Sequence, residues 1–134
     1  MKIVYRDIKD FNEKDLQELF LSVGWSSGAY PGKLTVAMKN SGAVFTAWDN
    51  DKLVGLLNAL DDGIMTAYLH YLLIKPDYQG KGIGKELVRL VSERYKDYLR
   101  IVLIAYNKEV GFYKNCGFEI GKETTPMFVT SLWT

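Results

Sequence analysis

The sequence predicts a mixed α+β (α/β) fold with a mostly antiparallel sheet of six to seven strands and helices on both faces. Short apolar runs of strand length alternate with amphipathic runs of helix length along the chain. Two clusters of turn residues, at 49–51 and 61–63, predict hairpins between antiparallel neighbours. A strand, a helix and a second strand follow one another from 66 to 106, which favours a right-handed crossover with parallel pairing.

The first elements are predicted from their apolar spacing and capping residues. Residues 3–8 have the composition of a strand. Asn12 is expected to cap a helix over 13–22, whose apolar side chains fall on one face. A loop rich in Ser, Gly and Tyr occupies 26–32, and a second short helix is expected over 33–40.

The middle of the chain predicts three strands in succession. Residues 44–48 and 53–60 flank the Asp-Asn-Asp turn at 49–51, so they are expected to form a hairpin. The Asp-Asp-Gly turn at 61–63 leads into a third strand over 66–74. These strands would form the antiparallel part of the sheet.

The clearest helical pattern covers residues 85–98, with apolar side chains at helical spacing. The run 100–106 is continuously apolar from 101 to 105 (Ile-Val-Leu-Ile-Ala), as expected for a strand buried on both faces. Residues 108–115 predict a short helix with Gly117 as its C-cap.

Residues 118–120 and 127–132 predict two final strands. Neither linker nor repeat divides the sequence, and 134 residues suit one sizeable core. We therefore expect a single domain over 1–134.

Composition and charge narrow the class of protein. The net charge of +1 predicts no strong attraction to nucleic acid or membrane. A single cysteine excludes an intrachain disulfide, and neither a signal-peptide core nor a long apolar run is found. We expect a cytoplasmic protein, monomeric or homodimeric, without a metal site and without nucleic-acid or membrane partners.

The most informative segment is the Gln-Gly-Lys-Gly-Ile-Gly run at 79–84, between a strand and a helix. Glycines let the backbone approach an anion closely, and a helix N-terminus adds unpaired N–H donors. Lys81 and Lys85 add positive charge. The spacing excludes the dinucleotide fingerprint and the Walker A loop.

This Q-x-x-G-x-G run, preceded by Leu72-Leu73-Ile74-Lys75-Pro76, resembles the acetyl-CoA loop of the GNAT superfamily of N-acetyltransferases. Residues 111–118 resemble the second signature of that family, F-Y-x-x-x-G-F. The resemblance implies a GNAT-like fold and acetyl-CoA as the cofactor. A Gly-Trp near position 25, an Asn-Ser near 40 and a Met-Phe near 127 also resemble the chloroplast and bacterial members of the arylalkylamine type. That subgroup acts on arylalkylamines and on protein amines.

The resemblance implies which residues contact acetyl-CoA. The pantetheine arm would lie along the strand before the loop, and the pyrophosphate would rest on the loop and helix start. The implied contacts are Leu72, Leu73, Ile74, Gln79, Gly80, Lys81, Gly82, Ile83, Gly84, Lys85 and Tyr113. The family often has an asparagine seven residues before the tyrosine, where this chain has Tyr106. Asn107, one residue later, is expected to replace it.

Acetyl transfer to an amine needs an acid for the departing thiolate and a base for the amine. The resemblance implies that Tyr113 is the acid, although it could instead be an aromatic packing residue. His70 is the only histidine and the natural base, or a member of a water relay. A hydrogen-bonded core histidine is the alternative. Asp61 and Asp62 are second candidates as base, as amine ligands or as solvated carboxylates.

Other chemically capable side chains are expected to be structural or to bind substrate. Cys116 has no base beside it in the sequence and is expected to be buried rather than reactive. Trp25 and Tyr30 could line an amine pocket or belong to the core, and Trp48 is expected in the core.

These observations predict an N-acetyltransferase that moves the acetyl group of acetyl-CoA to a primary amine by direct attack in a ternary complex. The amine could belong to a small molecule or a protein. A non-catalytic acetyl-CoA-binding sensor or scaffold is the alternative. A nucleotide-binding regulatory domain would fit the glycine loop but not the second signature.

Overall fold

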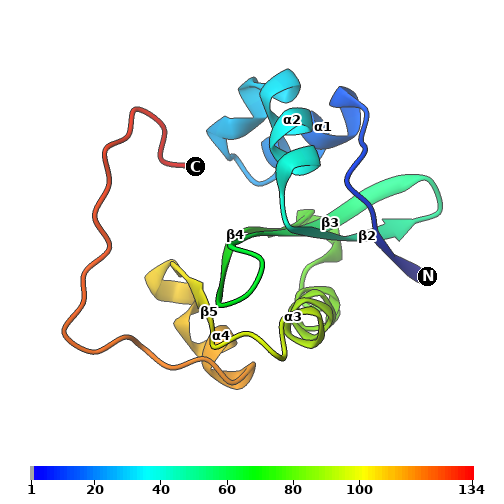
Figure 1. Ribbon diagram of the computed structural model, residues 1–134. Coiled ribbons are helices and arrows are strands. Elements are labelled where there is room, and N and C mark those ends of the chain that lie inside the picture. The colour runs from blue at the N-terminus through cyan, green and yellow to red at the C-terminus, as the bar shows by residue number, and fades with distance from the viewer. Residues whose placement is uncertain (1) are drawn as a thin grey trace.

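The computed structural model describes residues 2–134. Its sheet has five strands in the order β1-β2-β3-β4-β5 (Figure 1). Neighbours from β1 to β4 are antiparallel, and β4 pairs with β5 in parallel. The strands are β1 (Ile3–Asp7), β2 (Ala43–Asp49), β3 (Lys52–Asp61), β4 (Thr66–Ile74) and β5 (Arg100–Leu103). The mixed fold class is confirmed, whereas the expected six to seven strands are wrong.

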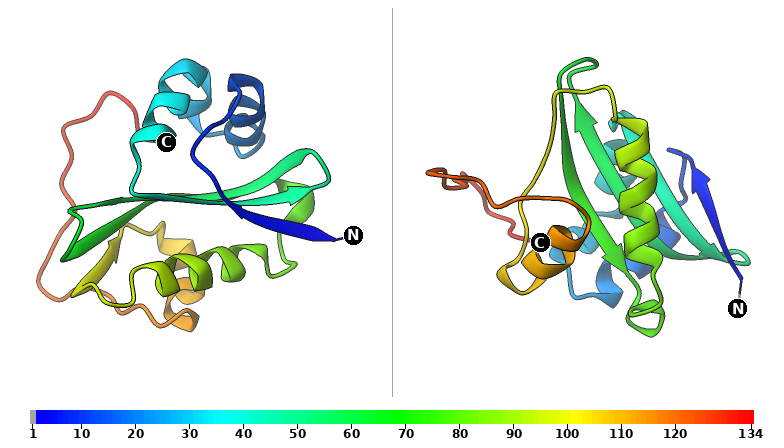
Figure 2. Two further views of the ribbon diagram at one scale, coloured as in Figure 1. Left: turned by 45° about the vertical axis from the view of Figure 1, so that its right-hand side comes forward. Right: turned by 90° about the horizontal axis from the view of Figure 1, so that it is seen from below.

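Helices cover both faces of the sheet, as predicted (Figures 1 and 2). One face carries α1 (Glu13–Ser22) and α2 (Pro31–Asn40), and the other carries α3 (Ile83–Arg94) and α4 (Val110–Asn115). Single 3₁₀ turns precede α2, α3 and α4, at Ser26–Ala29, Pro76–Tyr78 and Asn107–Glu109. Among residues 2–134, none of the helices has the length and apolar character needed to cross a membrane.

Local sequence explains where most helices begin and end. The Asn12 side chain accepts a hydrogen bond from the backbone N–H of Asp15 at 2.8 Å, so the predicted cap of α1 is confirmed. Helix α2 begins at Pro31, two residues earlier than expected, because proline fits the first turn of a helix. Helix α3 ends at Arg94, four residues earlier than expected. Gly117 follows α4 with φ of +97°, which fits the predicted cap.

Two apolar cores lie on the two faces of the sheet. Leu16 and Phe20 of α1 are fully buried against one face. Leu87 and Val91 of α3 are fully buried against the other. Burial of each such side chain is worth about 1.5–3 kcal/mol relative to exposure. Trp48 lies in the α1–α2 core, as expected.

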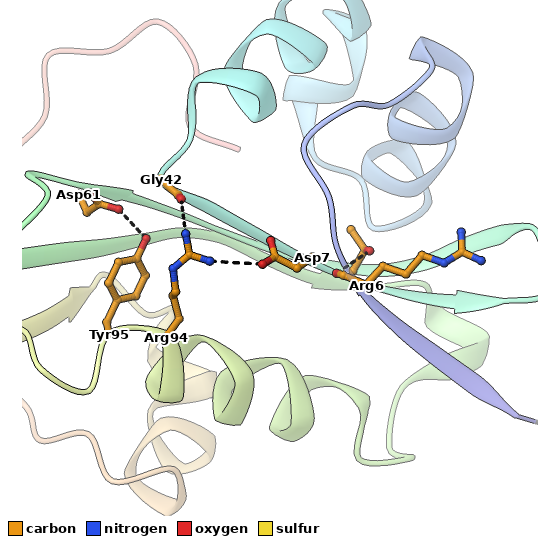
Figure 3. Close-up of polar contacts among 7 residues, drawn as sticks. Arg6, Asp7, Gly42, Asp61, Arg94 and Tyr95 are labelled. Carbon is orange, nitrogen blue, oxygen red and sulfur yellow. Dashed lines mark hydrogen bonds and ion pairs between the residues drawn. The ribbon is translucent and has the colours of Figure 1, made fainter.

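Polar contacts fix the C-terminal end of α3 against the sheet (Figure 3). The Arg94 guanidinium donates to the Asp7 carboxylate at 3.3 Å and to the Gly42 carbonyl at 3.4 Å. The Tyr95 hydroxyl donates to the Asp61 carboxylate at 2.6 Å. Burial and this carboxylate raise the pKa of Tyr95 above its ordinary value, so the hydroxyl remains a donor. These contacts connect α3 to β1, β3 and the start of β2.

The last third of the chain departs from the sequence prediction. Strand β5 ends at Leu103 and lies at the edge of the sheet, so the prediction of a strand over 100–106 buried on both faces is wrong. Helices α1 and α2 do not cover β5, which leaves Val102 42% exposed. The predicted strands at 118–120 and 127–132 do not form, because these segments have no neighbouring strand to pair with. Residues 119–133 are exposed, and Thr134 accepts hydrogen bonds from Ser27.

A substitution at Gly42 tests the contact between α3 and the sheet. A Cβ at this position would collide with the Asp61 carboxylate and lie 2.9 Å from the Tyr95 hydroxyl. We expect Gly42→Ala to break that hydrogen bond and lower the free energy of unfolding by about 1–3 kcal/mol, measured by urea denaturation. Gly111→Ala is the matched control, because a Cβ in α4 meets no atom within 4 Å. Equal stability of the two variants would contradict the prediction.

Candidate functional site

The loop between β4 and α3 has the backbone geometry of an anion-binding turn. Gly80 and Gly82 have φ values of +74° and +86°, which side chains other than glycine rarely adopt. A Cβ at either position would meet no atom within 4 Å, so the space beside the loop is open. Helix α3 begins directly after Gly82, and the first N–H groups of a helix have no partner within it. Lys81 and Lys85 are exposed beside these donors.

Hydrogen bonds to the sheet hold this loop in place. The Gln79 side-chain amide donates to the Ile74 carbonyl at 2.9 Å and closes the loop back onto the end of β4. The Lys75 N–H donates to the Val54 carbonyl at 2.8 Å. The Tyr78 hydroxyl donates to the Asp49 carboxylate. The loop is therefore anchored on one side and open on the other.

Two of the predicted loop residues have packing roles. The Ile83 side chain is buried in the core under α3, so only its backbone is available to a ligand. A Cβ on Gly84 would lie 3.4 Å from the Phe112 ring, so Gly84 lets α4 approach α3 closely. This contact brings the second sequence signature to the glycine loop.

Strands β4 and β5 pair over only part of their length. The parallel ladder runs from Thr66 with Arg100 to Leu69 with Leu103, and β5 ends there. Strand β4 continues to Ile74, paired with β3 on its other side. From His70 onward, the edge of β4 that faced β5 has no strand partner. Its backbone groups can therefore bind an extended ligand, and Leu72, Leu73 and Ile74 lie on this segment.

A β-bulge occurs where the two strands part. Leu57 is paired with Leu72 and Ala59 with Leu69, so Asn58 faces both His70 and Tyr71. Tyr71 packs in the α1–α2 core, and the His70 ring stacks on it with 4.0 Å between centroids. His70 is exposed and not part of the core, so the alternative of a core histidine is wrong. Neighbouring side chains partly cover its ring and lower the pKa of His70 below its ordinary value, because partial burial disfavours the charged ring.

Tyr113 lies on the opposite face of the sheet from His70. It belongs to α4 and packs with the α3 core, between the rings of Phe112 and Phe118. Burial raises the pKa of Tyr113 to about 12, with a smaller contribution from the Glu109 carboxylate. The phenol therefore stays protonated at neutral pH and can donate a hydrogen bond.

The other residues that the sequence singled out lie outside the glycine loop and the unpaired edge of β4. Asn107 is exposed at the start of the 3₁₀ turn before α4. Asp61 accepts from Tyr95, and the Asp62 carboxylate accepts three backbone N–H groups of its own turn, which lowers its pKa. Cys116 is half-buried, and burial raises the pKa of its thiol. Within residues 2–134, no cluster of three or more His, Cys, Asp or Glu side chains could hold a metal ion.

A cavity of about 300 Å³ opens on the α1–α2 face beside Tyr71. Its lining comes from the η1 turn, α2, β4 and the C-terminal segment: Ser27, Tyr30, Lys33, Leu34, Ala37, Tyr71, Ser131 and Leu132. The Ser27 and Tyr71 hydroxyls are hydrogen-bonded at 2.9 Å. Trp25 packs on Tyr71 outside this lining, with 6.0 Å between centroids. Sequence reasoning missed Tyr71, since strand alternation gives no signal of the bulge. It also missed Ser27, which only the fold brings to Tyr71.

Comparison with known proteins identifies relatives of this chain. A family model described as an acetyltransferase (GNAT) domain matches residues 40–120. The uncharacterized N-acetyltransferase ycf52 of Pyropia yezoensis is 34% identical over 128 residues, which cover 87% of this chain and 73% of that protein. The chloroplastic GCN5-related N-acetyltransferase 2 of Arabidopsis thaliana is 33% identical over 91% of this chain. The chain spans only 55% of that plant protein's length.

A solved structure has the same architecture over nearly the whole chain. It is the GNAT-family acetyltransferase SP0256 of Streptococcus pneumoniae TIGR4, with a TM-score of 0.84 and 28% identity. The match covers 97% of this chain and 98% of that one.

Proposed function

Because the chain belongs to the GNAT acetyltransferase family, we propose that it moves the acetyl group of acetyl-CoA to a primary amine by direct attack in a ternary complex. Family membership makes the chain an acyltransferase, which disfavours the non-catalytic sensor or scaffold. The acceptor amine belongs to a small molecule or to a protein.

One observation carries the proposal: the open glycine loop continues directly from the unpaired edge of β4. The left-handed Gly80 and Gly82 leave space where a side chain would project, which fits a pyrophosphate. Donors at the start of α3, with Lys81 and Lys85, would neutralise its charge. The free backbone of Leu72 to Ile74 fits an amide-bearing pantetheine arm by strand addition. Bound acetyl-CoA would supply the acetyl thioester.

The proton donor in this proposal is Tyr113. A pKa of about 12 keeps the phenol protonated throughout the useful pH range. An ordinary thiol has a pKa of about 8.5, so complete transfer from this phenol to a thiolate is uphill. Tyr113 would therefore stabilise the departing sulfur mainly by a hydrogen bond. The proton that it transfers as the C–S bond breaks would be replaced from solvent, which returns the phenolate to the phenol.

The amine would arrive from the α1–α2 face, where the cavity beside Tyr71 lies. Neutral His70 on this face would accept its proton, directly or through water. Because burial lowers the pKa of His70, the basic form predominates at neutral pH. Asp61 and Asp62 are less suited to this role, because their carboxylates already accept hydrogen bonds from the backbone of the hairpin between β3 and β4 and, for Asp61, from the Tyr95 hydroxyl.

Glycine loop variants test the binding of acetyl-CoA. We expect CoA and acetyl-CoA to raise the melting temperature of the protein, whereas NAD and ATP do not. Gly82→Val should abolish the CoA shift by blocking the backbone. Gly63→Val is the matched control, since Gly63 also has φ of +86° with open space around it, but lies in the turn after β3. If both variants lose the CoA shift, or if neither does, the glycine loop is not the binding site of CoA.

Removal of the phenol tests the acid. Tyr113→Phe keeps the ring and its packing but loses the donor. We expect kcat to fall at least about tenfold with the Kd of acetyl-CoA little changed, measured by thiol release and calorimetry. Tyr106→Phe, at an exposed position outside α4, is the control and should keep its activity. Unchanged turnover in Tyr113→Phe would make the phenol structural.

A pH profile tests the base. Activity should be full at neutral pH and should fall as the pH drops through the lowered pKa of His70, below about 6.5. His70→Gln should lower kcat and remove this limb while binding of CoA persists. An unchanged acidic limb in His70→Gln would mean that another group accepts the proton. Joint loss of stability and activity would make His70 a structural residue.

A further inference from the structure

Asn58 is a buried polar residue that the proposed chemistry has not used. It lies in the middle of β3 with 1% of its surface exposed. Its neighbours Leu57 and Ala59 point into the α3 core, so Asn58 points to the α1–α2 face. A buried amide is costly unless its donors and acceptor are paired, so its partners indicate what it does.

The Asn58 side chain is hydrogen-bonded to the bulge. Its oxygen accepts the backbone N–H of Tyr71 at 2.9 Å. In a regular antiparallel pair this N–H would bind a backbone carbonyl or point to the next strand, but the extra residue at His70–Tyr71 breaks the ladder. The Asn58 oxygen therefore takes the place of a backbone acceptor.

The other end of the Asn58 amide is tied to α2. Its nitrogen donates to the Ser41 hydroxyl at 3.1 Å, and that hydroxyl donates to the Ala37 carbonyl at 2.8 Å. Ser41 is the C-cap of α2 and is buried. The amide is thereby fixed in orientation, with its oxygen toward β4.

The bulge decides which residues share a face of β4. In a regular strand, His70 and Tyr71 would point to opposite faces. The bulge instead places them side by side, with their rings stacked at 4.0 Å. Loss of the bulge would shift the register by one residue and send one of the two side chains to the other face.

We propose that Asn58 is a positioning residue for acetyl transfer, which holds the bulge by accepting the Tyr71 N–H and so keeps His70 and Tyr71 together where β4 and β5 part. The effect on turnover rests on the proposed function. The effect on the bulge does not.

Two variants of similar size test the role of the oxygen. Asn58→Leu removes the acceptor, and Asn58→Asp keeps it. We expect kcat of Asn58→Leu to fall at least about tenfold, because small misplacements of reacting groups cost that much or more. The KM of acetyl-CoA should change less than about threefold, since the glycine loop is untouched. Asn58→Asp should restore most of kcat.

The control is Ser41→Ala, which removes the partner of the Asn58 nitrogen and leaves the bond to Tyr71. It should lose less activity than Asn58→Leu. Three outcomes would each overturn the proposal. The first is that Ser41→Ala loses as much activity as Asn58→Leu, and the second is that Asn58→Asp loses as much as Asn58→Leu. The third is full activity in Asn58→Leu.

Two measurements on the bulge do not require turnover. In the wild-type protein, the Tyr71 amide hydrogen should exchange with solvent far more slowly than exposed amides. In Asn58→Leu, the NMR titration of His70 should move from its lowered pKa toward the ordinary value of about 6.5 as the stack is lost. Rapid exchange at Tyr71 would overturn the proposal, even if Asn58→Leu failed to fold. Slow exchange at Tyr71 and the expected shift in the His70 titration, in a protein that acetylates no amine, would refute the proposed function and leave the role of Asn58 in the bulge intact.

Discussion

The candidate site depends on the point where β4 and β5 stop pairing. Parallel strands usually pair along their length, which leaves no backbone group free in the middle of a sheet. Here the ladder ends at Leu69 and Leu103 while β4 continues to Ile74. The parting leaves the second half of β4 with an unpaired edge beside the edge strand β5.

Helix α3 connects this opening to the rest of the molecule. Its N-terminus follows the glycine loop, and its C-terminal end is held to the sheet by Arg94 and Tyr95 (Figure 3). The exposed Arg94–Asp7 ion pair contributes little by itself, on the order of 0–1 kcal/mol. The buried apolar face of α3 provides most of the attachment. A helix fixed along its whole length holds the donors of its first turn in a constant position relative to β4.

Local signals made part of the structure predictable. The glycine loop, the cap at Asn12 and the hairpin turns are encoded by a few adjacent residues, and they were found in the sequence. The bulge was not, because it depends on a contact between Asn58 and Tyr71, 13 positions apart. The final strands at 118–120 and 127–132 failed for a related reason: an apolar, β-prone run becomes a strand only beside a partner. Strand β5 was likewise expected to be buried because its composition does not reveal that it lies at an edge.

Partial burial shifts the pKa values of the two titratable candidates in opposite directions, and each shift keeps the group in the protonation state that the proposed chemistry starts from. Neighbouring side chains partly shield the exposed His70 ring, which disfavours its charged form and lowers its pKa. The half-buried Tyr113 loses its phenolate for the same reason, which raises its pKa. At neutral pH the first is thus a base without its proton and the second a donor with its proton. The pKa shift of His70 comes from partial burial alone, and the Glu109 carboxylate adds only a smaller contribution to the shift of Tyr113. The apolar packing on the two faces of the sheet can therefore assign acid and base roles to Tyr113 and His70 without an ion pair between them.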